Sequence, residues 1–427
     1  MFVKKTIRDI DLDNKSILLR ADYNVPIKNG KVKDDFRIIQ SLETIHYLLA
    51  RNCKIVICSH LGRPEANNNS DYSLFPVAKR LQELLDTPVQ FVTDCIGPKA
   101  QEAKKKLAKG QILLLENLRF HKEEEQNDDN FAIELAKFSD IFVQDGFGVV
   151  HRMHASTSAI TKHLPAVAGL LLEKEVDVIT NVMENPKRPL VALIGGSKVA
   201  DKIDVIERFI NIADFVAIGG AMANTFLAAL GIDIGKSIYS KGDVPLARDI
   251  LKEVSKIRKE KDFIFCLPFD GVVAKKIDSN IQTRIVDWST NVISDIEFYP
   301  KKPPIRALKI AEDELILDIG PFSGSFIAGA LQLSNTVIWN GTMGVTEVSA
   351  YHGPVGPYAH GTDLILQSLM GDFGKRPFSV VGGGDTASYI AERHLQEAVN
   401  HLSTGGGASL ELMSGHKLPG VEALLDK

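Results

Sequence analysis

Short apolar runs that end in glycine or polar turns alternate with helix-period segments along the chain, and this rhythm constrains the fold most. Such runs include SILLRADYNVP, KIVICSHLGRP and QILLLENLRF in the first half, and LVALIGGSK, LILDIGPFSG and FSVVGGGDT in the second. Between them, the segment RIIQSLETIHYLLA places Ile38, Leu42, Ile45 and Leu49 on one stripe. DVIERFINIAD and SYIAERHLQEAV have a similar period. Strands alternating with helices predict an α/β fold of two doubly wound, Rossmann-like parallel-sheet domains.

The length of 427 residues is too great for a single core, so we expect more than one domain. The stretch from Leu170 to Pro189 predicts one long helix that is ended by Asn185 and Pro186. We expect this helix to join the two halves. The predicted divisions are residues 1–169, the interdomain helix at 170–189, and residues 190–402.

Composition excludes several classes of protein. A net charge of −4 and a pI near 6.3 give no bulk attraction for nucleic acid or an anionic membrane, so neither is an expected partner. The N-terminus lacks a signal-peptide core, and no apolar run approaches the ~18 residues of a membrane span. We therefore expect a cytoplasmic protein. Its four cysteines form no Cys-x-x-Cys pair and are predicted to be buried, reduced thiols.

In the first half, charged and polar side chains gather at the predicted strand ends. Ligands of open α/β sheets bind beyond the carboxyl ends of the strands. The residues there, or at the following helix start, are Asp22, Asn24, Arg37, His60, Arg63, Arg119 and Arg152. Because guanidinium groups match carboxylate and phosphate oxygens, this pattern predicts a small ligand with more than one acidic group. The charged stretch HKEEEQNDD is interpreted as a solvated loop.

In the second half, glycines follow the predicted strands. They occur in GGSK at Gly195, GGAMA at Gly219, NGTMG at Asn340 and GGGDT at Gly382. Glycine lets the backbone approach a ligand closely, and helix N-termini favour phosphate. Lys198 and Lys202 are four residues apart, which predicts one shared face at the start of a helix. Asp385 is placed to hold Mg²⁺. The chain has no G-x-x-x-x-G-K-[ST] motif, so it is not a P-loop enzyme.

The motifs RADYNVP, SHLGRP, ENLRFHKEEE, QDGFGVVHRMHAS, GGSKVADKI, IWNGTMGVTE, VVGGGDTAS and HLSTGGGASLELMSG occur in this order. With them, the chain closely resembles the phosphoglycerate kinase family over essentially its whole length. The resemblance implies a monomeric two-lobed enzyme of glycolysis. It would transfer the acyl phosphate of 1,3-bisphosphoglycerate to Mg-ADP, giving 3-phosphoglycerate and Mg-ATP. Residues 403–427 would pack back on the first domain.

The resemblance also implies the residues of two binding sites. The 3-phosphoglycerate site would comprise Asp22, Tyr23, Asn24, Arg37, His60, Leu61, Gly62, Arg63, Arg119 and Arg152. The nucleotide site would comprise Lys198, Lys202, Gly219, Asn340, Glu347, Gly382, Gly383, Gly384, Asp385 and Thr386, with Asp385 at the Mg²⁺ ion. The groups expected to act on the transferring phosphoryl group are Arg37, Lys198, Lys202 and Gly384. Phosphoryl transfer is mainly positioning and charge neutralisation, so we expect no general base and no phospho-enzyme.

Some stretches depart from residues that are common in the family. They are Phe322–Gly324, Thr342 and Thr346, near where the family receives the base and ribose. They leave the preference between ATP and GTP open. Two alternatives also remain at this point: a kinase for another small acid, and a catalytically silent anion-binding scaffold of the same fold.

Overall fold

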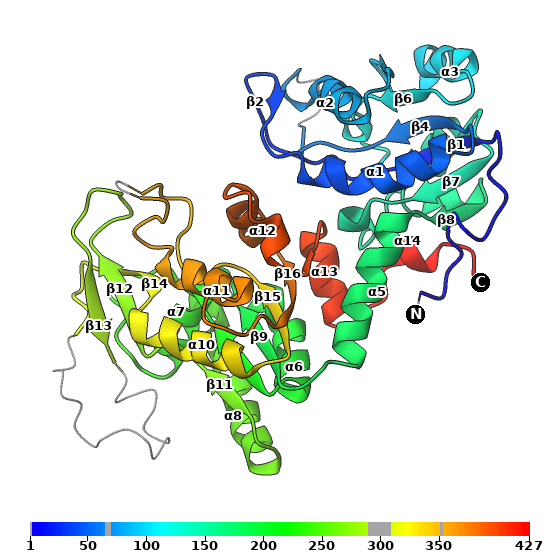
Figure 1. The fold of residues 1–427 in the computed structure, drawn as a ribbon. Coiled ribbons are helices and arrows are strands. Elements are labelled where there is room, and N and C mark those ends of the chain that lie inside the picture. The colour runs from blue at the N-terminus through cyan, green and yellow to red at the C-terminus, as the bar shows by residue number, and fades with distance from the viewer. Residues whose placement is uncertain (1, 65–69, 289–308, 351–352) are drawn as a thin grey trace. The chain divides into compact units, whose positions relative to one another are not determined.

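The computed structural model describes residues 2–64, 70–288, 309–350 and 353–427. The chain divides into two compact units (Figure 1). Unit 1 comprises residues 1–181 and 404–427, and unit 2 comprises residues 182–403.

Unit 1 is built on a parallel sheet in the order β5-β6-β4-β1-β7-β8. Its strands are β1 (Ser16–Arg20), β4 (Lys54–Cys58), β5 (Val89–Val92), β6 (Ile112–Leu115), β7 (Ile141–Gln144) and β8 (Ala166–Ala168). β1 lies at the centre and pairs in parallel with both β4 and β7. Because the chain leaves β1 toward one side and later returns to its other side, the strand order reverses there. The carboxyl end of β1 is where ligands bind in such sheets.

The helices that precede α5 in unit 1 of the described chain are α1 (Phe36–Leu49), α2 (Phe75–Leu85), α3 (Gly97–Lys106) and α4 (Asp129–Ala136). α1 follows the predicted stripe, and Ile38 and Ile45 are buried in the core with Ile17 and Leu19 of β1. Figure 1 shows α1 lying along this sheet. A short hairpin, β2 (Ile27–Lys28) and β3 (Lys31–Val32), precedes α1.

The C-terminal segment belongs to unit 1 and contains α13 (Gly406–Met413) and α14 (Pro419–Glu422). It is tied to the first residues of the chain and to β8. Leu425 N donates to Ala166 O, and Lys5 N donates to Leu425 O, at 3.0 and 2.7 Å. The side chain of Lys4 also pairs with Asp426. Both ends of the chain therefore help to close the same edge of the unit.

The long helix predicted from Leu170 is α5 (Leu170–Glu184), which ends one residue before Asn185. The chain passes from unit 1 to unit 2 within this helix. Its first turn is capped by Asp145, whose Oδ1 accepts the backbone N–H groups of Leu171 and Leu172. The cap satisfies two donors that an α-helix leaves without intrahelical partners.

Unit 2 is built on a parallel sheet in the order β11-β10-β9-β15-β16-β17. The strands are β9 (Leu190–Ile194), β10 (Phe215–Ile218), β11 (Ile264–Cys266), β15 (Thr336–Asn340), β16 (Phe378–Gly382) and β17 (His401–Leu402). Among the described residues of unit 2, the helices are α6 (Ile203–Ile212), α7 (Gly220–Ala229), α8 (Val244–Glu260), α10 (Pro321–Leu333), α11 (His360–Met370) and α12 (Gly384–Ala391). In chain order the strands read 3-2-1-4-5-6, the Rossmann arrangement. The two parallel sheets confirm the predicted α/β fold.

The run LILDIGPFSG does not join this parallel sheet. It forms β14 (Leu315–Ile319), which pairs antiparallel with β12 (Asp270–Ala274), and β12 also pairs antiparallel with β13 (Arg284–Asp287). β12 begins four residues after β11 ends, whereas a parallel crossover needs a dozen residues or more. The segment SYIAERHLQEAV is also helical only as far as Ala391, and His394 has a φ of +56°.

Candidate functional sites in the two units

The centre of the unit 1 site is His60, which follows β4 and is 4% exposed. Burial lowers the pKa of His60 well below 6.5, and positive charges around it lower the pKa further. The groups that exert this effect are the guanidinium groups of Arg20, Arg119, Arg37 and Arg152. The imidazole is therefore neutral, and cationic groups surround it. Such a cluster is suited to an anionic ligand.

Asp22 follows β1, and its carboxylate accepts two hydrogen bonds in this cluster. Its Oδ2 accepts Arg37 Nη1 at 2.7 Å, and its Oδ1 accepts the backbone N–H of Asn24 at 3.1 Å. The side-chain oxygen of Asn24 in turn accepts Gly62 N at 2.8 Å. Gly62 has a φ of +61°, a conformation that favours glycine. These contacts join the strand ends of β1 and β4 to the start of α1.

Arg119 lies in a 3₁₀ turn after β6, and its side chain is only 6% exposed. Its Nη1 donates to Gly62 O at 2.7 Å, and Asn117 Oδ1 accepts its backbone N–H. Burial lowers the pKa of Arg119. Arg152 follows β7 and donates from Nε to His151 Nε2 at 3.1 Å. Both predicted arginines therefore reach the cluster.

The remaining residues predicted for the unit 1 site differ in how exposed they are. Tyr23 is fully buried, and its hydroxyl group bonds with Ser41. Leu61 is also buried, with its N–H donated to Asn117. Arg63 is exposed and is not among the arginines that lower the pKa of His60 most. The backbone N–H of Tyr23 donates to Ser59 Oγ as well, so both residues support the strand ends from within the core.

Arg20 is a member of the cluster that the sequence analysis missed. It is the last residue of β1 and is 1% exposed, and its Nη2 lies 3.3 Å from His60 Nδ1. A charged residue inside an apolar run was the signal that could have identified it. Lysine and arginine are almost never fully buried without a partner, so such a residue is expected to serve a buried site.

In unit 2, glycines line the point where the strand order reverses, between β9 and β15. An added Cβ at Gly195 would lie 2.0 Å from Thr342 O, and one at Gly220 would lie 2.8 Å from Gly196 N. Gly220 also has a φ of +63°. Only glycine therefore allows the ends of β9, β10 and β15 to approach one another. Gly219, the N-cap of α7, would similarly collide with Met343.

The lysine pair does not share a helical face. Lys198 lies in an exposed turn, and Lys202 ends a 3₁₀ turn (Ala200–Lys202) before α6 begins. The prediction of a shared helix start was wrong, because the glycine-rich turn extends beyond Lys198. The ammonium group of Lys202 folds back, donating to Gly195 O at 2.6 Å and to Asn340 Oδ1 at 2.7 Å. Burial lowers the pKa of Lys202 to about 8.

The GGGDT turn lies beside these residues. Gly382 ends β16, Gly383 is the N-cap of α12 with a φ of +94°, and Gly384 begins the helix. Thr386 is buried, and its hydroxyl accepts Gly341 N at 2.9 Å. Asn340 Nδ2 is buried with no hydrogen-bond partner among the described residues. A free helix N-terminus and an unpaired donor therefore adjoin Lys202.

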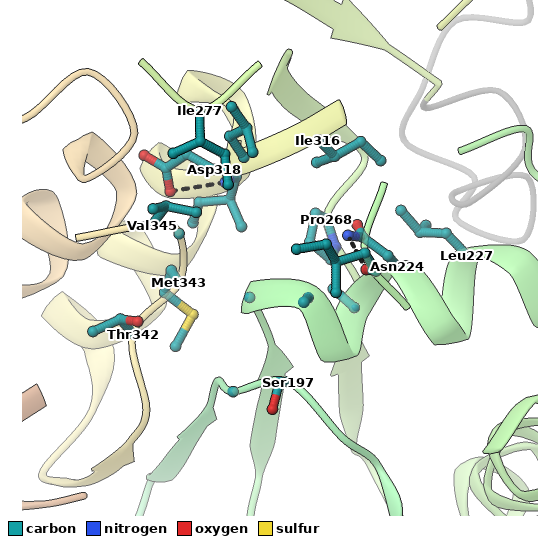
Figure 2. Close-up of a pocket in the computed structure, with 18 of the residues that line it drawn as sticks. Ser197, Asn224, Leu227, Pro268, Ile277, Ile316, Asp318, Thr342, Met343 and Val345 are labelled. Atoms are coloured by element: carbon teal, nitrogen blue, oxygen red, sulfur yellow. Dashed lines mark hydrogen bonds between the residues drawn. The ribbon is translucent and has the colours of Figure 1, made fainter. Parts of the chain in front are cut away.

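A cavity of roughly 330 Å³ opens beside this turn (Figure 2). Thr342, Met343 and Val345 line it from the segment after β15, and Asn224 and Leu227 line it from α7. Its apolar wall also includes Ile238, Pro268, Ile277, Trp288 and Ile316. Gly196, Glu347 and Asp385 lie on the same lining. An apolar wall continuous with a glycine-rich, phosphate-type turn suits a nucleotide, and the volume lies in the usual range for ligand sites.

The predicted metal ligand fits this arrangement. Asp385 is exposed in the first turn of α12 and borders the cavity. A carboxylate oxygen is the kind of ligand that Mg²⁺ takes alongside phosphate oxygens. The unpaired Asn340 Nδ2 and the glycine cradle supply donors for the same phosphates. The residues present are therefore suited to a metal-bound nucleotide.

A second cluster with metal-ligand chemistry lies in unit 1. Asp94, Cys95 and His121 each place one ligand-type atom within 4.8 Å of the others. Oδ1 of Asp94 already accepts the N–H of Cys95 and bonds with His121 Nε2, both at 2.8 Å. Burial also raises the pKa of the Cys95 thiol. We interpret this cluster as a structural cap for the segment that precedes α3.

Comparisons with known proteins identify the family of this chain. A family model described as phosphoglycerate kinase matches residues 7–416. Phosphoglycerate kinase from Pelotomaculum thermopropionicum is 42% identical, covering 99% of this chain and 100% of the relative. That from Desulforapulum autotrophicum is 43% identical, covering 98% and 100%. No described helix has the length and apolarity needed to cross a membrane.

Solved structures show the same relationship. Phosphoglycerate kinase from Pyrococcus horikoshii superimposes with a TM-score of 0.81 at 30% identity, over 99% of this chain and 98% of that one. The Coxiella burnetii phosphoglycerate kinase gives a TM-score of 0.78 at 32% identity, over 98% of each chain. The chain therefore belongs to the phosphoglycerate kinase family, whose members are phosphotransferases.

Proposed function

We propose that unit 1 binds 3-phosphoglycerate and unit 2 binds the Mg-nucleotide in this phosphoglycerate kinase. The observation that supports this assignment is the division of charge between the units. A buried histidine surrounded by arginines lies in unit 1, and a glycine-lined strand reversal with a partly buried lysine lies in unit 2. The first suits a ligand with carboxylate and phosphate groups, and the second suits a polyphosphate.

In unit 1, Arg37, Arg63, Arg119 and Arg152 neutralise the two acidic groups of 3-phosphoglycerate. The Asp22–Arg37 ion pair keeps the guanidinium of Arg37 oriented, because the carboxylate fixes Nη1 at 2.7 Å. His60 contributes a neutral hydrogen-bond donor rather than a further charge. Arginine is preferred here because its planar fork binds carboxylate and phosphate with two hydrogen bonds.

In unit 2, backbone N–H groups of Gly219 and Gly382–Thr386 bind phosphate oxygens, and Glu347 receives the ribose hydroxyl groups. Asn340 donates its unpaired Nδ2–H to a phosphate oxygen. Asp385 would hold Mg²⁺, which supplies charge neutralisation for the phosphate oxygens when it is bound with the nucleotide. Lys198 and Lys202 then stabilise the negative charge of the transferring group.

The transfer itself needs little covalent work from the protein. The acyl phosphate of 1,3-bisphosphoglycerate and the terminal oxygen of ADP exchange one phosphoryl group directly and reversibly. Arg37, Lys198, Lys202 and the N–H of Gly384 surround that group, and no side chain becomes phosphorylated. Preorganised donors of this kind lower the barrier because they are already oriented toward the charge that develops.

Each ligand is assigned to a different unit, so the two units must come together for direct transfer. We propose that the presence of both ligands favours a closed state, because the transferring group is then shared between Arg37 and Lys198. Small-angle scattering with 3-phosphoglycerate and Mg-nucleotide together should show compaction beyond that given by either ligand alone. Unchanged scattering from an active enzyme would contradict closure.

We also propose that the protein is a cytoplasmic monomer, with residues 403–427 completing the first domain. A coupled assay of ATP-dependent phosphorylation of 3-phosphoglycerate tests the function directly. Activity should require Mg²⁺ and should disappear when 3-phosphoglycerate is replaced by an acid without a phosphate group. Absence of turnover from the folded protein would favour a silent binding protein instead.

A further inference from the structure

A buried carboxylate, Glu124, lies beneath the arginine cluster of unit 1. It belongs to the charged stretch that the sequence analysis interpreted as solvated, yet its side chain has no exposed surface. Oε2 of Glu124 accepts the backbone N–H of Ser156 at 2.9 Å, and Oε1 accepts the Ser156 hydroxyl at 2.5 Å. Burial raises the pKa of Glu124, while the charge of Arg20 opposes this shift. The interpretation as a solvated loop was wrong for this residue.

The Ser156 hydroxyl connects Glu124 to Arg20. A hydroxyl has one proton to donate, and Ser156 gives it to the carboxylate. Its oxygen can then only accept, and Arg20 Nε donates to it at 2.8 Å. Arg20 Nη1 donates to its neighbour's carbonyl, Ala21 O, and the whole side chain is buried. The guanidinium plane is thus held at two points before it reaches His60.

The third contact of Arg20 determines the state of His60. Arg20 Nη2 lies 3.3 Å from His60 Nδ1, and a guanidinium group can only donate hydrogen bonds. Nδ1 must therefore accept, so the single ring proton of the neutral imidazole lies on Nε2. Asp22 Oδ1 is 3.8 Å from the same Nδ1, too far to compete as a hydrogen-bond acceptor.

We propose that Glu124 and Ser156 are positioning residues for the substrate site: through Arg20 they hold His60 in the tautomer that presents Nε2–H as a neutral donor to an anionic ligand. The ligand contact of His60 rests on the function proposed above, whereas the tautomer does not. Glu124 compensates the buried charge of Arg20, and Ser156 transmits its orientation. Without them, Arg20 has no fixed acceptor for Nε, and the ring of His60 loses its defined proton position.

The tautomer can be measured without any substrate. Histidine-labelled protein and a Glu124→Gln variant are compared by long-range ¹H–¹⁵N correlation spectra, with His60→Asn used to assign the signal. In the parent protein, His60 should show an unprotonated Nδ1 and a protonated Nε2 from about pH 6 to pH 8. In Glu124→Gln, this pattern should be replaced by a mixture of tautomers.

We call the hydrogen-bonded chain Glu124–Ser156–Arg20 the relay. Two further variants distinguish loss of this relay from a general loss of structure. Ser156→Ala removes only the bridging oxygen and leaves the Glu124 carboxylate in place, so it decides the question if Glu124→Gln does not fold. It should give the same mixed tautomer. Glu123→Gln removes a neighbouring, partly exposed carboxylate and should leave the His60 spectrum unchanged. A parent-like His60 spectrum in folded Glu124→Gln and in Ser156→Ala would overturn the proposal.

Kinetics then connect the relay to substrate. We expect KM for 3-phosphoglycerate to rise about tenfold in Glu124→Gln and in Ser156→Ala, with kcat and the KM for ATP changed less than about twofold. The double variant should be no worse than the poorer single variant, because both act through one hydroxyl. Altered tautomers with unchanged KM for 3-phosphoglycerate would support the relay but overturn the substrate role of His60. Additive losses would overturn transmission through Ser156.

Discussion

The ammonium group of Lys202 donates a 2.7 Å hydrogen bond to the side-chain oxygen of Asn340, across the strand reversal of unit 2. Lys202 is thus held by protein oxygens at the place proposed for phosphate. Burial lowers its pKa to about 8, so the group changes charge close to neutral pH. Binding of a phosphate would favour the charged form.

Deprotonation of Lys202 is expected to cause the fall of activity at alkaline pH, which is the alkaline limb of the pH–activity profile. A lysine is charged below its pKa, so kcat/KM for ATP should fall as the pH rises through about 8. In Lys202→Arg the limb should disappear from the measured range, because arginine stays protonated. Lys241→Arg, which changes an exposed lysine of the same unit outside the proposed site, is the control and should keep the limb. If the activity of Lys202→Arg still fell at alkaline pH, a group other than Lys202 would be responsible for the fall.

Arg37 and Arg63 should differ in their effect on turnover. Arg37 is held by Asp22 and is one of the arginines that lower the pKa of His60 most, whereas Arg63 is exposed. Arg37→Ala should lower kcat at least ~10-fold more than Arg63→Ala does, because it removes an interaction made with the transferring group. Steady-state kinetics with 3-phosphoglycerate measure both. Equal kcat in the two variants would contradict the role proposed for Arg37.

The cap of α5 should make stability depend on pH. Burial raises the pKa of Asp145 from 3.8 to about 7. The folded protein therefore keeps a proton that the unfolded chain releases, and this contribution to stability is lost as pH rises toward 7. Asp145→Asn should reduce the fall of the unfolding free energy between about pH 4 and pH 7 by up to ~1.4 kcal/mol per pH unit.

Urea unfolding of the two proteins across this pH range measures the difference in slope. Asp13→Asn, which changes an exposed carboxylate of the same unit, is the control and should keep the slope of the parent protein. Identical slopes for Asp145→Asn and the parent protein would show that the buried carboxyl does not titrate as expected.

Gly220 should tolerate no side chain. Its φ is +63°, and an added Cβ would lie 2.8 Å from both N and O of Gly196. Gly220→Ala should cost ~1–3 kcal/mol of stability and weaken ATP binding, because the turn after β9 must shift. Gly242→Ala is the control, since Gly242 has open space and an ordinary φ. Unfolding curves measure the stability of the two variants, and calorimetry measures their ATP binding. Equal values for Gly220→Ala and Gly242→Ala would contradict this prediction.

The apolar cavity wall is expected to discriminate weakly between bases. Two polar groups of its lining are already engaged: Trp288 Nε1 donates to Pro268 O at 2.7 Å, and Asn224 Nδ2 donates to Ile238 O at 3.0 Å. We therefore predict less than ~100-fold preference for ATP over GTP in kcat/KM. A larger preference would mean that backbone groups of the lining read the base edge.

Much of the fold and of the candidate sites could be predicted because the relevant signals are local. The alternation of apolar runs with helix-period segments predicted both parallel sheets, and it placed Asp22, His60 and the glycine turns at strand ends. The antiparallel pairing of β14 with β12 could not be predicted, because the residues of an apolar run do not indicate which strand it will pair with. Partner choice depends on connection lengths and on packing across the whole unit.

Burial of charge was decided only by the tertiary structure. In the sequence, Glu124 is one of three successive glutamates, and nothing local separates it from its neighbours. In the folded unit it alone of the three is fully buried, because Ser156, far away in the chain, supplies both of its donors. Arg20 stands out in the sequence as a charge in an apolar run, but its partner His60 is known only once β4 pairs beside β1. The sequence by itself determined the elements and the chemistry at their ends, since dihedral preference and periodicity act over a few residues. Only the tertiary structure decided which charged groups are buried away from water and which protein groups replace water as their hydrogen-bond partners, since those groups lie tens of residues apart in the chain.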